Sequence, residues 1–384
     1  MSRSATVAVV RSENRRGAVA QALHLIADDL RAAVAADVLI KPSLPGPRRQ
    51  LGSTHADALS ATLDAVLAAG GERVIVAEGG EDASAGFDRF GFRKEAIGRP
   101  VAFLDLDRQE TAWDAVELRS VDGQPLRARV SRTIAAAPCR VSVAPAATHG
   151  TASLSLGLMN MLSGIHPDDR AMMRGESGAD GPPGWKRPAA EFLDGDGPAA
   201  GVLARVLGRA RRLKAACTGK ARDDAWRRFA RREIALLRTA ETLARNLAAL
   251  AGAAMPHISV VDGFAAMHRE GPRHGTPIRL GTIIAGTDAV AVDAVASAVM
   301  GFDPMRIGHL RYAHEAGLGL ADPGSIVVVG DPVAVVRRRC VPHSNHAILR
   351  HWDRLPEIIA SGRAGSALPA PHVAIPRPAE PARR

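Results

Sequence analysis

The sequence predicts an α/β fold, in which helices flank a mostly parallel sheet, and three observations lead to this prediction. Short apolar segments rich in β-branched residues alternate with segments of helical periodicity. The apolar segments are hydrophobic on both faces, as strands covered by helices on both sides are. At 384 residues the chain also exceeds the size at which a single core keeps growing, so we expect excursions from the sheet.

The amino-terminal elements follow the order that produces parallel strands. Residues 5–10, 37–40 and 73–77 are predicted strands, and each ends in a polar or glycine-containing turn. Two amphipathic helices are expected in the connections between them. Strand, helix, strand, helix, strand is the pattern of helices packed on a parallel sheet.

The middle of the chain mixes strands with excursions. Residues 101–106 and 140–143 predict strands, and 116–130 predict a β-hairpin around the turn Asp122-Gly123. A short helix with Asn160 follows, and Asn160 is either a satisfied core amide or a ligand contact. Residues 202–250 then read as helical.

The stretch 256–304 organises the prediction of a site. Its strands 258–261 and 281–285 end in Asp262-Gly263 and Gly286-Thr287-Asp288, and a helix containing Asp293 follows. We expect both strands to deliver a carboxylate to their carboxyl ends, the edge at which ligands bind open α/β sheets.

These elements predict one core with insertions. Residues 1–150 form an α/β amino-terminal part, 151–255 an irregular loop and a basic helical insertion, and 256–361 an α/β carboxyl-terminal part that completes the same core. Within the insertion, the Gly-, Pro- and Asp-rich residues 174–201 suggest an excursion or lid. Residues 362–384 lack periodicity and are expected to be disordered.

Composition and missing motifs exclude several protein classes. Aromatic residues are only 3% of the chain, which leaves few platforms for stacking bases. No phosphate-binding loop, dinucleotide glycine fingerprint, GxSxG elbow or HExxH pair occurs. The three cysteines are far apart, which is typical of reduced intracellular thiols. No apolar run reaches the ~18 residues of a membrane span, so we expect a cytoplasmic protein; its oligomeric state is open.

The formal charge of +10 favours an anionic partner, although arginines occur along much of the chain. Residues 202–250 contain a dense basic run. It fits a helical hairpin with a solvated basic face, or a contact with nucleic acid or phosphate. The members of the run are Arg209, Arg211, Arg212, Lys214, Arg227, Arg228, Arg231 and Arg232.

Polar residues recur where predicted strands end, and a shared edge would collect them in one crevice. His149, Asp262 and Asp293 are the predicted catalytic residues. They are also the predicted ligands if a divalent metal is bound; alternatively, His149 acts as a general base. The predicted ligand-binding residues, suited to a small anionic molecule, are Lys41, Glu78, Asn160, Arg273 and Asp288.

Each of these residues also has a structural interpretation. Asp262 before Gly263 suits a tight turn, and Asp288 suits a helix N-cap. Asp293 lies in an Ala/Val helix, where a buried carboxylate needs a partner. Arg273 belongs to the rigid turn Gly271-Pro272-Arg273-His274-Gly275, which closes over an anion or merely connects two elements.

Several segments together resemble the family called domain of unknown function 362, from about residue 5 to residue 330. The matching segments are VLIKPSLPGP from Val38, Thr54-His55, RVIVAEGG from Arg73, THG from Thr148, VVDGFAAMHREGPRHGTP from Val260, IIAGTDAVAVDAVASAVMGFDP from Ile283 and GLGLADPGSIVVVG from Gly317. The family has no agreed activity, and its members are often associated with iron–sulfur clusters.

This chain departs from the family pattern in two ways. The family usually has lysines before its Thr-His pair and a Lys-Asn pair in the next helix, where this chain has Pro145, Ala147 and Met159. A ferredoxin-like segment with closely spaced cysteines is absent, so no intrinsic iron–sulfur cluster is expected.

We therefore expect a small-molecule enzyme with a strand-edge Asp/His site, acting with or without a metal. The alternative is a non-catalytic binding or accessory protein that engages nucleic acid, an acidic partner or a redox partner.

Overall fold

The computed structural model describes residues 4–46, 49–80, 82–176 and 223–360, with the isolated positions 206 and 210. Side chains at 223–230 and 359–360 are outside this description. The fold is α/β, as predicted. Ten strands of the described chain form one sheet, whose main path has the order β12-β1-β11-β9-β7-β2-β3-β4, while β8 pairs with β7 and β10 with β9.

The strands of the main path come from both ends of the chain. Their bounds, in sheet order, are β12 (Ile326–Gly330), β1 (Ala5–Arg11), β11 (Thr282–Gly286), β9 (Ile258–His268), β7 (Cys139–His149), β2 (Asp37–Pro42), β3 (Arg73–Glu78) and β4 (Val101–Asp105). The two short strands are β8 (Ser153–Ser155) and β10 (Thr276–Ile278).

One strand of the main path runs against the others. β11 is antiparallel to both β1 and β9, whereas every other neighbouring pair along the path is parallel. Gly286 at the end of β11 therefore pairs with Ser259 near the start of β9. The expectation that Asp288 joins the carboxyl edge of the parallel strands is wrong, because it follows a strand that points the opposite way.

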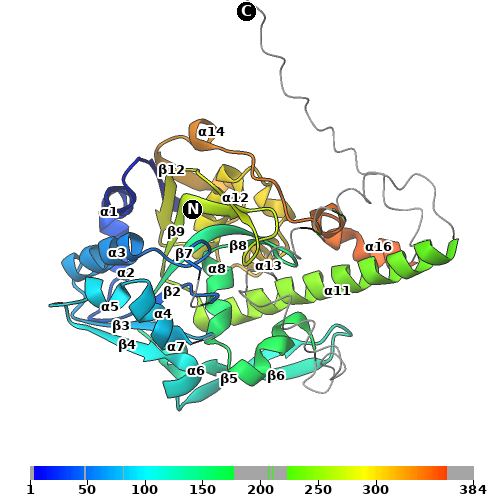
Figure 1. Cartoon of the computed structure of the whole chain (residues 1–384), viewed down its shortest axis with the longest axis horizontal. Helices are drawn as coiled ribbons and strands as arrows, with labels where there is room; N and C mark the ends of the chain where they lie inside the picture. Colours follow the sequence, from blue (N-terminus) through cyan, green and yellow to red (C-terminus); the bar gives the residue numbers. More distant parts are fainter. Residues whose placement is uncertain are drawn as a thin grey trace, which may run out of the picture.

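Helices cover one face of the sheet with a layer from the amino-terminal half of the chain (Figure 1). Their apolar side chains pack on alternate strand residues such as Val38 and Ile40 of β2 and Ile258 and Val260 of β9. The helices are α1 (Arg15–Leu25), α2 (Ala27–Ala33), α3 (Ala56–Ala68), α4 (Ala83–Arg89) and α5 (Phe92–Glu95).

The opposite face carries two clusters. Val261 of β9 packs with α12 and α13, and Leu39 of β2 packs with the hairpin and α11. The main elements here are α8 (Gly157–Asn160), α11 (Asp223–Ala254), α12 (Ala289–Val299) and α13 (Gly308–Glu315). Because successive strand residues alternate between faces, Lys41 shares the face of Leu39, whereas Asp262 shares the face of Val260.

The predicted hairpin is confirmed as a separate two-stranded sheet of β5 (Trp113–Arg119) and β6 (Pro125–Ser131). It lies against α11, the long helix in the lower half of Figure 1. The remaining short elements are α6 (Leu106–Gln109), α7 (Arg132–Ala135), η1 (Met161–Gly164), η2 (Pro167–Arg174), η4 (Pro304–Arg306), η5 (Pro323–Ser325), α14 (Val333–Val336), α15 (His346–Leu349), η6 (Trp352–Arg354) and α16 (Leu355–Ala360).

Three expectations fall on segments beyond this description: the lid within 174–201, the basic residues from Arg209 to Lys214, and the tail 362–384. Within the described part of the chain, no helix is both long enough and apolar enough to cross a membrane.

Candidate functional site

Lys41 and Glu78 form a buried ion pair at the carboxyl ends of β2 and β3. Lys41 is 0% exposed and Glu78 is 3% exposed. The Lys41 ammonium also donates hydrogen bonds to the Pro42 carbonyl oxygen at 3.3 Å and to Asn160 Oδ1 at 3.4 Å. Each of its three hydrogens therefore has an acceptor, as a buried ammonium group requires.

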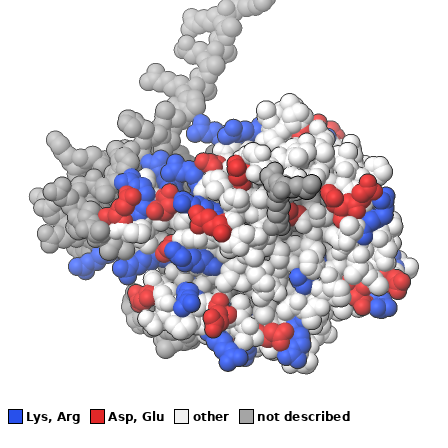
Figure 2. Space-filling model, turned by 180° about the vertical axis from the view of Figure 1, so that it is seen from behind, with Lys and Arg blue, Asp and Glu red and all other residues white. Residues whose placement is uncertain are grey.

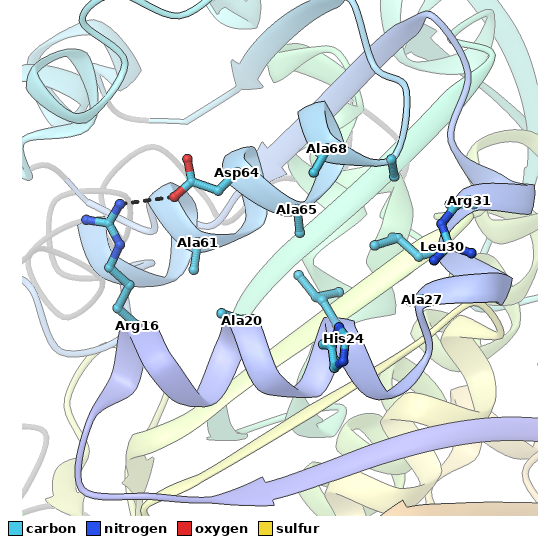
Figure 3. A pocket seen from close by; sticks show the side chains of 12 residues that line it. Arg16, Ala20, His24, Ala27, Leu30, Arg31, Ala61, Asp64, Ala65 and Ala68 are labelled. Atoms are coloured by element: carbon cyan, nitrogen blue, oxygen red, sulfur yellow. Dashed lines mark hydrogen bonds and ion pairs between the residues drawn. The ribbon is translucent and has the colours of Figure 1, made fainter.

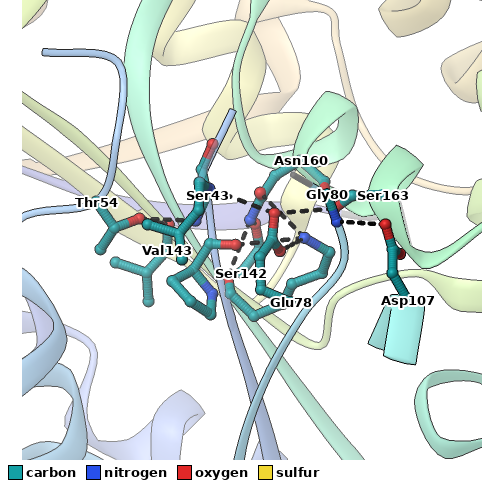
Figure 4. Close-up of polar contacts among 12 residues, drawn as sticks. Ser43, Thr54, Glu78, Gly80, Asp107, Ser142, Val143, Asn160 and Ser163 are labelled. Atoms are coloured by element: carbon teal, nitrogen blue, oxygen red, sulfur yellow. Dashed lines mark hydrogen bonds and ion pairs between the residues drawn. The ribbon is translucent and has the colours of Figure 1, made fainter. Parts of the chain in front are cut away.

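Asn160 connects this pair to the neighbouring strand (Figure 4). Its Nδ2 donates to the Lys41 carbonyl oxygen at 2.9 Å and to Ser142 Oγ on β7 at 3.0 Å. Ser142 Oγ in turn donates to the Gly157 carbonyl oxygen at 3.0 Å. Three of the predicted ligand-binding residues, Lys41, Glu78 and Asn160, thus lie in one network, which we call the lysine network together with Ser142.

Burial controls the protonation of the ion pair. It lowers the pKa of Lys41 and raises the pKa of Glu78, while the charge of each partner opposes the shift in the other. Glu78 Oε1 also accepts hydrogen bonds from Leu44 N at 3.3 Å and from Ser163 Oγ at 3.1 Å. Because burial disfavours both charges, a proton moves between these two groups more easily than between a lysine and a glutamate in water.

A half-buried ion pair lies between the lysine network and the surface. Arg170 of η2 donates from Nη1 to Asp107 Oδ2 at 2.9 Å and from Nη2 to the Ser163 carbonyl oxygen at 2.8 Å. Asp107 Oδ2 also accepts from Gly80 N at 2.9 Å. The side chains of Arg170 and Asp107 are 22% and 19% exposed, so they bring charge from the surface to the neighbourhood of Glu78.

Asp293 supports the lysine network from α12 without contacting the ion pair. Its Oδ1 and Oδ2 accept hydrogen bonds from the backbone N–H groups of Gly157 and Leu158, each at 2.9 Å. These are the first two residues of α8, the helix that ends with Asn160. Burial raises the pKa of Asp293 to about 7, although the two N–H groups favour its ionised form. Asp293 is therefore a positioning residue.

Asp262 lies on the other face of the sheet, where its Oδ2 is 3.1 Å from Nε of Arg15 in α1. Its Oδ1 accepts a hydrogen bond from Phe264 N at 2.9 Å, which is the turn interaction that the sequence suggested. Burial raises the pKa of Asp262, and the Arg15 charge opposes this.

His149 ends β7, beyond the level of the lysine network. Its Nδ1 accepts hydrogen bonds from Thr151 N and Ala152 N, both at 3.0 Å. When neutral, the ring therefore carries its proton on Nε2, and neither nitrogen offers a free lone pair to a metal. Burial lowers the pKa of His149 to about 4, with smaller contributions from the charges of Arg174 and Arg273.

The structure does not bring the predicted metal ligands together. Asp262 and Asp293 lie on opposite faces of the sheet, and His149 uses Nδ1 to accept backbone hydrogen bonds. Within the described chain, no group of three or more His, Cys, Asp or Glu side chains is arranged to hold a metal ion. Asp288 is the N-cap of α12, accepting from Ala291 N at 3.0 Å.

The basic helix is only partly described. Arg231 and Arg232 are exposed on α11, whereas the side chains of Arg227 and Arg228 lie outside the description. On the face drawn in Figure 2, acidic and basic side chains lie beside one another rather than in one block of positive charge. This face therefore offers no concentrated basic surface for nucleic acid.

Sequence reasoning missed Asp107, Ser142, Ser163 and Arg170. Asp107 had a usable signal, since it directly follows the predicted strand 101–106. Arg170 had none, because nothing in its neighbourhood indicates that η2 folds back onto the strand ends.

A groove of about 380 Å³ lies between α1, α2 and α3 (Figure 3). Alanines such as Ala20, Ala61 and Ala65 line it, and an Arg16–Asp64 ion pair of 3.0 Å spans it near one end. None of the predicted site residues lines this groove.

Comparison with known proteins places the chain in a family. The family model described as Domain of unknown function (DUF362) matches residues 38–298, more than half of the chain. The protein belongs to this family. The matched DUF362 region contains Lys41, Glu78, Asn160 and Asp293, so the lysine network and its support lie within the family domain. His309 and His343 lie after it.

One curated relative is the "Thylakoid-associated protein sll1697" of Synechocystis sp. (strain ATCC 27184 / PCC 6803 / Kazusa). It is 28% identical over 109 residues, which are 28% of this chain and 30% of that protein. The similarity therefore spans less than a third of either chain.

Proposed function

We propose that this DUF362 protein binds a small anionic molecule at the carboxyl edge of its sheet and catalyses proton transfer on it through the lysine network. The observation that supports this most strongly is the buried Lys41–Glu78 pair with Asn160. Ligands of open α/β sheets bind at this edge, and ionisable pairs whose environments shift their pKa values are common in active sites.

The proposed roles follow from position. Arg170 is half-buried beside Gly80 and Ser163, so its guanidinium is the nearest described cation to attract a carboxylate or phosphate. Ser163 Oγ already donates to Glu78 Oε1 and links the half-buried layer to the ion pair. Glu78 and Lys41 then exchange a proton with the bound molecule, Glu78 as the acid and Lys41 as the base, or the reverse.

The cost of burying charge argues that the pair is retained for more than stability. A buried ion pair is often no more stabilising than well-packed apolar residues of similar volume. Two hydrophobic residues at positions 41 and 78 would join the same strands without any desolvation of charge.

A ligand screen tests this proposal. We would measure the thermal shift of the wild type with a panel of small carboxylates and phosphate-bearing molecules, and repeat each positive result with the double variant Lys41→Met/Glu78→Leu. The matched control is Asp262→Asn, which changes a buried carboxylate on the other face of the sheet.

The proposal predicts a molecule that stabilises the wild type and the control in a saturable manner but not the folded double variant. If every such molecule stabilises the double variant as strongly as the wild type, the lysine network is not the site. A hit that also accelerates exchange of a ligand proton with solvent, and does so only in proteins with Glu78, supports catalysis rather than binding alone.

A further inference from the structure

A second polar cluster lies at the far end of β7, where α13 packs beside the same end of the sheet (Figure 1). His309, the second residue of α13, is 1% exposed. Neither of its ring nitrogens has a hydrogen-bond partner among the described residues. Each buried polar atom left without a partner costs about 1–3 kcal/mol, so this imidazole is placed at a cost that a bound group would offset.

His149 lies near His309, close enough for its charge to act on that ring. Because its Nδ1 accepts two backbone hydrogen bonds, the neutral ring keeps the proton on Nε2 as a donor. His309 is held neutral mainly by burial, which lowers its pKa to about 3. Two neutral imidazoles supply N–H donors, and the ring of His309 keeps one acceptor nitrogen.

The surrounding charges and contacts define the neighbourhood. Arg273 and Arg174 are close enough to His149 to lower its pKa, so the local potential is positive. The strand end is fixed by the carboxyl-terminal segment, since Asn345 Nδ2 donates to the Gly150 carbonyl oxygen at 2.8 Å. The same segment carries His343, whose Nε2 lies 3.1 Å from Glu270 Oε2.

We propose that His149 and His309 line a second site, which binds the oxyanion of a phosphate or a carboxylate group. N–H donors in a region of positive potential suit an oxyanion. The arrangement does not suit a metal ion at His149, because that ring has no free lone pair when neutral. This site is independent of the lysine network, which belongs to other strand ends.

Titration with inorganic phosphate and, separately, with acetate tests this inference. The readout is the ring ¹H–¹⁵N NMR signals of the histidines at neutral pH and constant ionic strength. We would compare the wild type with His309→Leu and His149→Phe, and use His24→Gln, in the groove of α1, as the matched control. Lys41→Met/Glu78→Leu is included to separate this site from the lysine network.

Saturable shifts of the His149 and His309 signals are expected in the wild type, in His24→Gln and in Lys41→Met/Glu78→Leu. His309→Leu should remain folded, since it removes unpartnered polar atoms, and it should lose the saturable shift of His149. A response to phosphate alone identifies a phosphate site, and a response to acetate alone identifies a carboxylate site. Shifts that grow linearly with both anions, or that persist unchanged in His309→Leu, would overturn the proposal.

Discussion

Replacing Asp293 by asparagine tests how the support of α8 depends on pH. In the wild type, two carboxylate oxygens accept the N–H groups of Gly157 and Leu158. Asparagine keeps one acceptor oxygen and turns its NH₂ group toward the other N–H. The substitution also removes the only titrating group at this position, so its effect on the free energy of unfolding must change with pH.

The sign and size of this change follow from the pKa of Asp293. Burial raises it from 3.8 to about 7 in the folded protein. Between these values the folded state keeps a proton that the unfolded state has released, so the wild type loses stability as the pH rises toward 7. From about pH 5 to about pH 8 the loss is about 2.6 kcal/mol, at about 1.4 kcal/mol per pKa unit.

Urea denaturation at several pH values measures the effect. We expect the stability of Asp293→Asn, relative to the wild type, to rise by about 2–3 kcal/mol across this window. The control is Ser297→Ala, which removes the hydrogen bond from Ser297 Oγ to the Asp293 carbonyl oxygen in the same helix but no titratable group. A difference between Asp293→Asn and the wild type that is constant with pH would refute the raised pKa.

Three further predictions concern the residues around the two faces of the sheet. Arg15→Met leaves Asp262 buried without its cation and should cost about 3–5 kcal/mol in urea denaturation; unchanged stability would show that the ion pair is unimportant. Thr54→Val removes the hydrogen bond from Oγ1 to the Val143 carbonyl oxygen at 2.6 Å and the acceptor for Ser43 N at 2.8 Å, and should cost about 1–3 kcal/mol by the same assay. Because the predicted metal ligands lie apart, elemental analysis should find the same metal content in Asp262→Ala as in the wild type, and a stoichiometric metal lost from the variant would contradict the geometry.

The sequence was sufficient to predict the class of fold and part of the site. The apolar strands and the helices between them predicted the parallel sheet, and the polar residues after β2 and β3 predicted that Lys41 and Glu78 would meet. Asn160 stood out as an amide in an apolar helix. These inferences succeeded because parallel neighbours end at the same edge, whatever the details of packing.

The direction of β11 and the faces of the strands were beyond the sequence argument. An apolar segment such as 282–286 is hydrophobic whether it runs parallel or antiparallel, so the position of Asp288 was predicted at the wrong edge. The face that Asp262 occupies depends on strand register, which set it beside Arg15 rather than near Asp293. His309 gave no signal because its missing partners exist only in the folded chain.

The free energy of unfolding of Lys41→Met/Glu78→Leu tests the central claim most directly. If the ion pair is kept for function, this variant should be as stable as the wild type or more stable by about 1–4 kcal/mol, whereas Lys41→Met alone should lose about 3–5 kcal/mol. A double variant that loses as much stability as the single variant would show that the pair holds the strands together, and would contradict a functional lysine network.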